Sequence, residues 1–139
     1  MERRYEVVVV GGGPSGSAAA ESCAKAGLTT LLIEEQAHIG IPVQCAGLLS
    51  GSAFEECRVS RRSVLNTVSG ATVIGSHCSL SFHAEKTMAY VVDRSILDQE
   101  MAYAAANAGA DLAVKTQACG LDVRDHTVVT SGVNGKQQI

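Results

Sequence analysis

The sequence predicts an α/β fold, in which a parallel βαβ unit comes first and a small antiparallel β insertion follows. Three observations support this prediction. A β-branched apolar run opens the chain, an alanine-rich segment follows a glycine turn, and a second apolar run comes directly after that segment. Strands and helices that alternate with short joints form parallel sheets with right-handed crossovers. The 139 residues, 46% of them hydrophobic, can supply the core of one domain.

The expected βαβ unit occupies residues 5–33. Residues 5–10 are rich in valine and predict a fully buried strand of a parallel sheet. Residues 14–26 contain no β-branched side chain and predict a helix, with Pro14 in its first turn and Gly27 at its end. Residues 29–33 predict a second buried strand.

The expected insertion occupies residues 35–92. Its first part, residues 35–51, is irregular and rich in glycine, and a loop this long inside a compact domain is usually functional. A short helix is expected at residues 52–57. Polar and apolar residues then alternate in short pieces, which predicts antiparallel strands at 70–74, 79–82 and 88–92.

A second helix is expected at residues 93–108. Either Asp93 or Ser95 can cap its start, and Gly109 can end it. Its apolar stripe is expected to consist of Ile96, Leu97, Met101 and either Ala104 or Ala105.

Short strands are expected in the last thirty residues or so. Residues 110–114 predict a parallel strand, and 118–123 with 127–130 predict a hairpin or meander. Asn134-Gly135 is a strong turn signal, so a further strand should follow, and we expect the chain end to cut that hairpin in half. We therefore interpret residues 1–139 as the N-terminal part of a larger nucleotide-binding domain.

The turn between the first strand and the first helix carries the chemistry. Its sequence, Gly11-Gly12-Gly13-Pro14-Ser15-Gly16, satisfies the G-x-G-x-x-G pattern in the required strand–turn–helix context. Gly11 permits the tight turn, Gly13 lets the backbone approach a pyrophosphate, and Gly16 lets the helix pack closely. The N–H groups and the dipole of the helix N-terminus then face the phosphates.

Glu34 completes the pattern of a Rossmann-like dinucleotide site. It ends the second strand, 18 residues after Gly16, where a carboxylate accepts hydrogen bonds from ribose hydroxyls. The alternative is a glycine turn with an incidental glutamate. Two features favour FAD over NAD: only ten residues precede the turn, and the chain after Glu34 leaves the simple strand–helix alternation of a dehydrogenase domain.

Composition argues against several other classes. The net charge of −3 gives no sign of nucleic-acid binding. The five cysteines form no CxxC pair and the four histidines share no ligand spacing, so no metal site is expected. The apolar run behind the first basic residues is too short for a membrane span or a secretory signal, which favours a cytoplasmic protein.

Two further segments carry a family resemblance. Residues 40–47 read GIPVQCAG and residues 90–98 read YVVDRSILD. With the glycine turn, they make the chain similar to the geranylgeranyl reductase family of FAD-dependent enzymes, within the group typified by para-hydroxybenzoate hydroxylase. The resemblance implies that Glu34 holds the adenosine ribose, that Ala118 packs near the adenine, and that Ser15 and Gly16 lie at the pyrophosphate. It also implies that Cys45, Ala46 and the backbone near Leu48 line the flavin. Arg94 is expected to contact the cofactor.

The resemblance also implies an activity. Archaeal members of this family reduce double bonds of geranylgeranyl chains on membrane-lipid precursors, and the Pro-Val-Gln-Cys sequence resembles the archaeal type. An isoprenoid lipid substrate, an electron donor such as NAD(P)H or ferredoxin, and peripheral membrane contact of a full-length protein are therefore expected. The alternatives are a flavin-dependent monooxygenase of the hydroxylase type and an inactive nucleotide-binding fragment.

The sequence departs from the family in two respects. The family is roughly three times longer, with later motifs that complete the FAD site, so this chain alone is expected to be inactive. In addition, Leu48 stands where a glycine is expected.

Two residues have competing interpretations. Cys45 is either a flavin-proximal thiol with a part in the reaction or a buried structural cysteine. Arg94 either binds a phosphate or flavin oxygen through both guanidinium arms or is a surface arginine.

Overall fold

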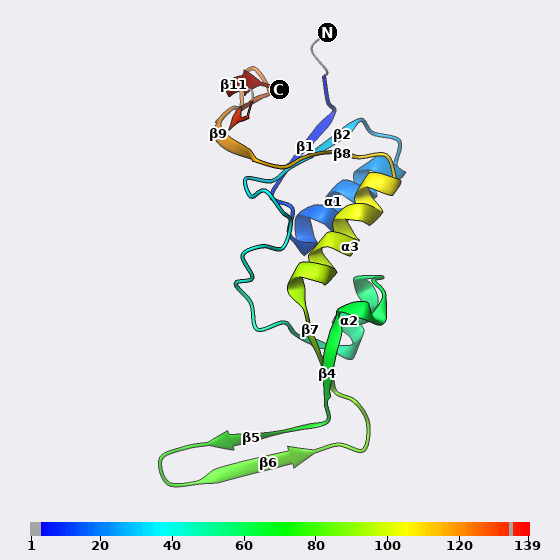
Figure 1. Ribbon diagram of the computed structural model, residues 1–139, viewed down its shortest axis with the longest axis vertical. Helices are drawn as coiled ribbons and strands as arrows, with labels where there is room; N and C mark the ends of the chain where they lie inside the picture. Colours follow the sequence, from blue (N-terminus) through cyan, green and yellow to red (C-terminus); the bar gives the residue numbers. More distant parts are fainter. Residues whose placement is uncertain (1–3, 134) are drawn as a thin grey trace.

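The computed structural model describes residues 4–133 and 135–139 and has a three-stranded parallel sheet, which lies above the two longest helices in Figure 1. The strand order is β1 (Val7–Val10), β2 (Thr30–Ile33) and β8 (Asp111–Ala113). The predicted α/β fold with its βαβ unit is therefore confirmed.

The two strands of the βαβ unit differ in burial. β2 is buried throughout, as predicted, because β1 and β8 flank it. The prediction that β1 is fully buried is wrong: it lies at an edge of this sheet, and Val10 is 59% exposed. A run of valines suits a central and an edge strand alike, so only the topology decides between them.

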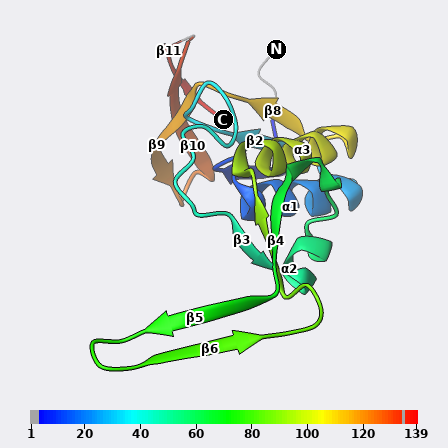
Figure 2. The same ribbon diagram turned by 60° about the horizontal axis from the view of Figure 1, so that its bottom comes forward.

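Helices α1 (Pro14–Lys25) and α3 (Arg94–Asn107) lie side by side against the sheet (Figures 1 and 2). Small side chains let the two helices approach each other closely, which explains why alanine dominates both. This core consists of Ala20, Ala24, Leu32, Ala105 and Ala110. In the described part of the chain, no helix has the length and apolar character needed to cross a membrane.

The ends of both helices follow their sequence signals. Pro14 occupies the first turn of α1, while Gly27 and Gly109 follow the two helices with φ of +85° and +109°. Of the two candidate caps of α3, Asp93 is the N-cap, because its side chain accepts a hydrogen bond from the Ser95 N–H. Within the predicted stripe of α3, Leu97, Met101 and Ala105 are buried, whereas Ile96 and Ala104 are only partly buried.

A second sheet adjoins the N-terminal end of α3. It pairs β3 (Leu48–Ser50), β7 (Ala89–Val92) and β4 (Val64–Val68) in antiparallel fashion, with α2 (Gly51–Glu56) and the 3-10 turn η1 (Arg61–Ser63) beside it. The sequence analysis found α2 and β7 but missed β3 and β4, which are short and mostly exposed. The core here consists of Phe54, Val92, Leu97 and Met101.

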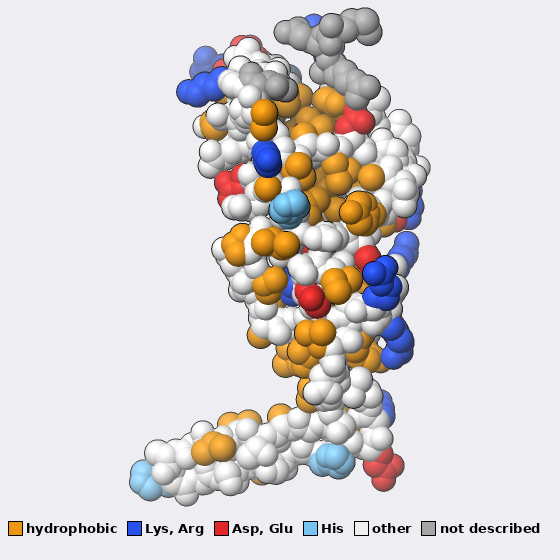
Figure 3. Space-filling view, viewed as in Figure 1, with side chains coloured by type: hydrophobic (Ala, Val, Ile, Leu, Met, Phe, Trp, Pro, Cys, Tyr) orange, Lys and Arg blue, Asp and Glu red, His pale blue; other side chains and the backbone are white. Residues whose placement is uncertain are grey.

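Strands β5 (Gly70–Ile74) and β6 (Ser79–His83) form the predicted antiparallel ribbon. This ribbon extends away from the rest of the molecule, and hydrophobic side chains are visible on its surface (Figure 3). Exposed fractions range from 57% to 79% for Val73, Ile74, Leu80 and Phe82.

The chain ends in a meander of β9 (Thr116–Asp122), β10 (Thr127–Gly132) and β11 (Gly135–Gln138). The predicted strand after Gly135 is thus confirmed, while the predicted turn residue Asn134 lies outside the described residues. The expectation that the chain end cuts this hairpin in half is wrong, because β11 pairs along its whole length with β10 (Figure 2).

Candidate functional site

The glycine turn joins β1 to α1 at the carboxyl edge of the parallel sheet. Gly11 has φ +100°, a conformation that side chains disfavour, and its N–H donates to the Ile33 carbonyl over 2.8 Å. A Cβ on Gly16 would overlap the Gly11 carbonyl oxygen and lie 3.1 Å from its carbonyl carbon. The close contact that Gly16 permits is therefore mainly with the turn itself, with Val9 behind it at 3.5 Å.

Gly13 faces open space in front of the helix. A Cβ built there meets no heavy atom within 4 Å. Gly13 is the N-cap of α1, whose first turn has no acidic residue and, within the described chain, no side-chain cap. The N–H groups and the positive end of the helix dipole thus remain available to an anion, as a pyrophosphate requires.

The Glu34 carboxylate lies over the same turn. Its Oε2 accepts the Gly12 N–H over 2.7 Å, and its Oε1 accepts the Gln36 N–H over 2.9 Å. These two bonds fix the carboxylate and still leave lone pairs on both oxygens, since an ionised carboxylate can accept about four hydrogen bonds. Glu34 thus keeps acceptor capacity beside the glycine turn, which its predicted role as the ribose ligand requires.

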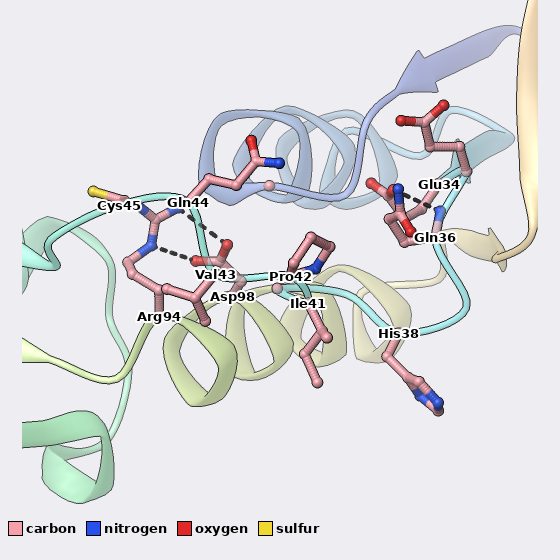
Figure 4. Close-up of a pocket in the computed structure, with 13 residues that line it drawn as sticks. Glu34, Gln36, His38, Ile41, Pro42, Val43, Gln44, Cys45, Arg94 and Asp98 are labelled. Atoms are coloured by element: carbon pink, nitrogen blue, oxygen red, sulfur yellow. Dashed lines mark hydrogen bonds and ion pairs between the residues drawn. The ribbon is translucent and has the colours of Figure 1, made fainter.

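A cavity of about 310 Å³ connects the turn with the loop after β2 and the start of α3 (Figure 4). Of the residues that the sequence predicted for the site, it brings together Gly13, Glu34, Cys45 and Arg94. The cavity is also lined by residues that were not predicted: Glu35, Gln36, His38, Gly40, Ile41, Pro42, Val43, Gln44 and Asp98.

The other predicted residues do not belong to the lining of this cavity. Ser15 is exposed in the first turn of α1, and Ala46 is exposed in the loop. Leu48 is 58% exposed in β3, opposite Val91, and Ala118 is paired with Thr130 in the terminal meander. The contacts of these four residues with the cofactor stay predictions, and so do those of Gly11 and Gly16, which shape the turn.

The loop at residues 40–47 is held against α3 and β7 by two glycines. A Cβ on Gly40, which has φ +77°, would lie 2.9 Å from the Ser95 Cα. A Cβ on Gly47, which has φ +68°, would overlap the Val92 carbonyl oxygen, and the Val92 N–H donates to the Gly47 carbonyl over 2.8 Å. The irregular segment expected to be functional is thus anchored at both ends, while residues 41–46 between the two glycines are exposed and residues 41–45 line the cavity.

An ion pair of α3, Arg94 with Asp98, lies beside Cys45 of this loop (Figure 4). Arg94 Nε donates to Asp98 Oδ1 over 2.9 Å and Nη2 donates to Oδ2 over 3.0 Å. Figure 4 shows the guanidinium group beside the Cys45 thiol. The Gly47 N–H, which donates to Cys45 Sγ over 3.5 Å, lowers the pKa of the thiol, and the Arg94 guanidinium lowers it further.

Two alternatives from the sequence analysis are therefore wrong. Cys45 is exposed and lines the cavity, so it is not a buried structural cysteine. Arg94 is not a free surface arginine, because its side chain is only 20% exposed and paired with Asp98.

Asp98 is the residue that sequence reasoning missed most clearly. Its spacing of four from Arg94 on a predicted helix was a usable signal, since such residues are neighbours on a helix surface. No comparable signal marked Gln36 or His38, which reach the cavity from irregular backbone.

A glycine turn at a helix N-terminus with a carboxylate over it defines a dinucleotide-binding α/β protein. Residues 6–139 match the family model described as FAD dependent oxidoreductase, and the chain belongs to that family. The predictions of FAD as the cofactor and of a flavin-dependent oxidoreductase family are thereby confirmed.

Individual relatives confirm the resemblance to geranylgeranyl reductases. Digeranylgeranylglycerophospholipid reductase from Methanoculleus marisnigri is 39% identical over 123 residues, which cover 85% of this chain and 31% of that protein. The crystal structure of a geranylgeranyl bacteriochlorophyll reductase-like protein from Thermoplasma acidophilum has 37% identity and a TM-score of 0.86, covering 96% of this chain and 36% of that one.

Other comparisons define the limits of the similarity. A triple mutant of the flavin-dependent brominase Bmp2 has 20% identity and a TM-score of 0.79 over 98% of this chain and 36% of its own, which shows the fold alone. The chain spans about a third of the length of the curated reductases that it matches.

Proposed function

We propose that this chain is the FAD-binding part of a flavin-dependent oxidoreductase that reduces isoprenoid double bonds, of the geranylgeranyl type, in membrane-lipid precursors. The observation that carries the FAD part is the meeting of Gly13 and Glu34 at one cavity, with the helix N-terminus open beside them. Identity of 35% to 41% with proteins named as digeranylgeranylglycerophospholipid reductases supports the substrate class.

In this proposal, each part of the site has a separate task. The first-turn N–H groups of α1 bind the pyrophosphate, and Glu34 orients the adenosine ribose. Arg94 adds a positive charge at the opposite end of the cavity, near Cys45. Bound FAD supplies the hydride chemistry that amino-acid side chains lack. NAD(P)H and ferredoxin both remain candidate electron donors, and the cytoplasmic location and peripheral membrane contact stay predictions.

The FAD part is tested by titrating the purified chain into FAD and following flavin fluorescence. We expect saturable binding that Glu34→Gln weakens, because the variant loses the charge that holds the Gly12 N–H and the ribose. Glu21→Gln, which removes a partly exposed carboxylate of α1, is the matched control. Absence of binding by the folded wild-type chain would count against the FAD role.

A test of the substrate needs a full-length enzyme, because this chain covers only about a third of the reductases that it matches. We would replace the matching segment of the Methanoculleus marisnigri reductase by residues 6–139 and incubate the chimera with a geranylgeranyl lipid and dithionite. We expect mass spectrometry to show the gain of one H₂ per double bond reduced. A chimera that binds FAD but leaves the lipid unsaturated, where the parent enzyme reduces it, would refute the proposed substrate.

A further inference from the structure

The pairing of Arg94 with Asp98 is more specific than a surface ion pair. Asp98 is 5% exposed and lies on the buried side of α3, whereas Arg94 reaches the cavity from the first turn of that helix. The two bonds, of 2.9 and 3.0 Å, use both oxygens of Asp98 and both the Nε and Nη2 of Arg94. Two parallel bonds fix the plane of the guanidinium group as well as its position.

The surroundings leave little freedom to this pair. A Cβ on Gly40 would lie 3.1 Å from the Arg94 carbonyl oxygen and 3.2 Å from the Asp98 Cβ, so the loop packs directly on the pair. The next residue of the helix, Gln99, donates its Nε2 to the Ile39 carbonyl over 3.2 Å and holds the same loop. Helix and loop thus fix the Asp98 carboxylate, and the carboxylate fixes the guanidinium.

The guanidinium keeps donors for other partners. An arginine has five N–H donors in a planar fork, and the two bonds to Asp98 occupy only one edge of it. Cys45 lies beside the group at one end of the cavity (Figure 4). The other titratable groups that line the cavity, Glu34, Glu35 and His38, come from the segment that follows β2.

We propose that Asp98 is a positioning residue: it holds the Arg94 guanidinium so that its remaining donors meet the Cys45 thiol and an anionic group of the bound cofactor. The cofactor half of this statement rests on the proposed function, whereas the thiol half does not.

The thiol half is tested by whether the Cys45 thiol becomes more or less reactive when the Asp98 carboxylate is removed. By its charge alone, Asp98 raises the pKa of Cys45, so removing that charge without moving Arg94 would make the thiol more reactive. If Asp98 positions Arg94, its removal takes away the stronger, opposite influence of the guanidinium, and the thiol becomes less reactive. Thiolate is the species that alkylating reagents attack, so the alkylation rate reports the difference.

The experiment compares the wild-type chain with Asp98→Asn by iodoacetamide alkylation as a function of pH. Peptide mass spectrometry separates Cys45 from the other four free cysteines. We expect the rate at Cys45 near neutral pH to fall roughly two- to fivefold, the size expected for one charge contact at an exposed thiol. Glu21→Gln, which removes the other i,i+4 ion pair of the described chain, should leave the rate unchanged.

Asp98→Glu covers the case in which Asp98→Asn does not fold. It keeps the charge but displaces the carboxylate by one methylene, so a positioning role predicts a slower reaction and a pure charge effect predicts no change. An unchanged or faster reaction at Cys45 in a folded variant overturns the proposal. FAD titration of the same variants tests the cofactor half: if wild type binds no FAD, the proposed function fails while the alkylation result still decides the role of Asp98.

Discussion

Substituting alanine at two glycines of the same turn should separate folding from cofactor binding. A Cβ on Gly16 would overlap the Gly11 carbonyl oxygen, which is backbone and cannot swing aside. Alanine in a helix normally stabilises by about 0.5–1 kcal/mol relative to glycine, whereas overpacking of this kind costs about 1–3 kcal/mol or more. The clash exceeds the helix-propensity gain, so we expect Gly16→Ala to lower the free energy of unfolding.

Gly13→Ala should leave the fold nearly as stable as in the wild type but weaken the binding of FAD. Its Cβ would meet no heavy atom of the described protein within 4 Å, and Gly13 has φ −71°, which alanine adopts freely. We expect the free energy of unfolding to change by less than about 1 kcal/mol, the range of surface and cap substitutions. If the pyrophosphate lies there, the methyl group costs about 1–3 kcal/mol of binding, which weakens FAD about 5- to 150-fold.

Urea unfolding followed by circular dichroism measures the free energy of unfolding of both variants, and flavin fluorescence titration measures their affinity for FAD. A Gly13→Ala variant that binds FAD as tightly as wild type would refute the placement of the pyrophosphate at this turn. A Gly16→Ala variant as stable as wild type would refute the close approach of helix and turn.

Three further predictions concern other parts of the chain. Glu34→Gln should weaken FAD binding roughly tenfold or more in a fluorescence titration, because a charge-assisted bond is lost; unchanged affinity would contradict the ribose role. Leu97→Ala should cost about 2–5 kcal/mol in urea unfolding, because Leu97 is 1% exposed beside Phe54 and Val92; a loss below about 1 kcal/mol would contradict this packing. Hydrogen bonds from the Ser95 side chain, and to a smaller extent from its backbone, lower the pKa of Asp93 below 3.8. The stability that this carboxylate contributes is therefore present above that pH and is lost as the pH falls through its folded-state pKa. Unfolding of Asp93→Asn measured across this range should therefore show a weaker loss of stability on acidification, and equal pH slopes would contradict the cap.

The helices and the glycine turn could be predicted because their signals are local. Pro14, Gly27, Asp93 and Gly109 act on the backbone within a few residues, and the structure places each where the sequence analysis expected it. The position of Glu34 at the end of the second strand could be predicted in the same way, whereas its hydrogen bond with the Gly12 N–H comes from the structure.

The short strands β3 and β4 could not be predicted in this way. β3 has three residues, and most side chains of β4 face solvent, so neither shows the burial-driven alternation that identifies a strand. Both exist because they pair with β7, a partner that lies far along the chain. Strand pairing of this kind depends on tertiary contacts more than on intrinsic preference.

The sequence by itself determined the chemistry at the start of the chain: a turn without side chains, a helix N-terminus and a carboxylate one strand away, all set by local sterics and the strand and helix periods. Only the tertiary structure decided that β1 lies at an edge of the sheet formed by the described residues and that Asp98 holds Arg94 beside Cys45. The physical reason is distance along the chain. Cys45 and Arg94 meet because Gly40 and Gly47 let a distant loop pack on α3 and β7, and no local preference encodes that contact.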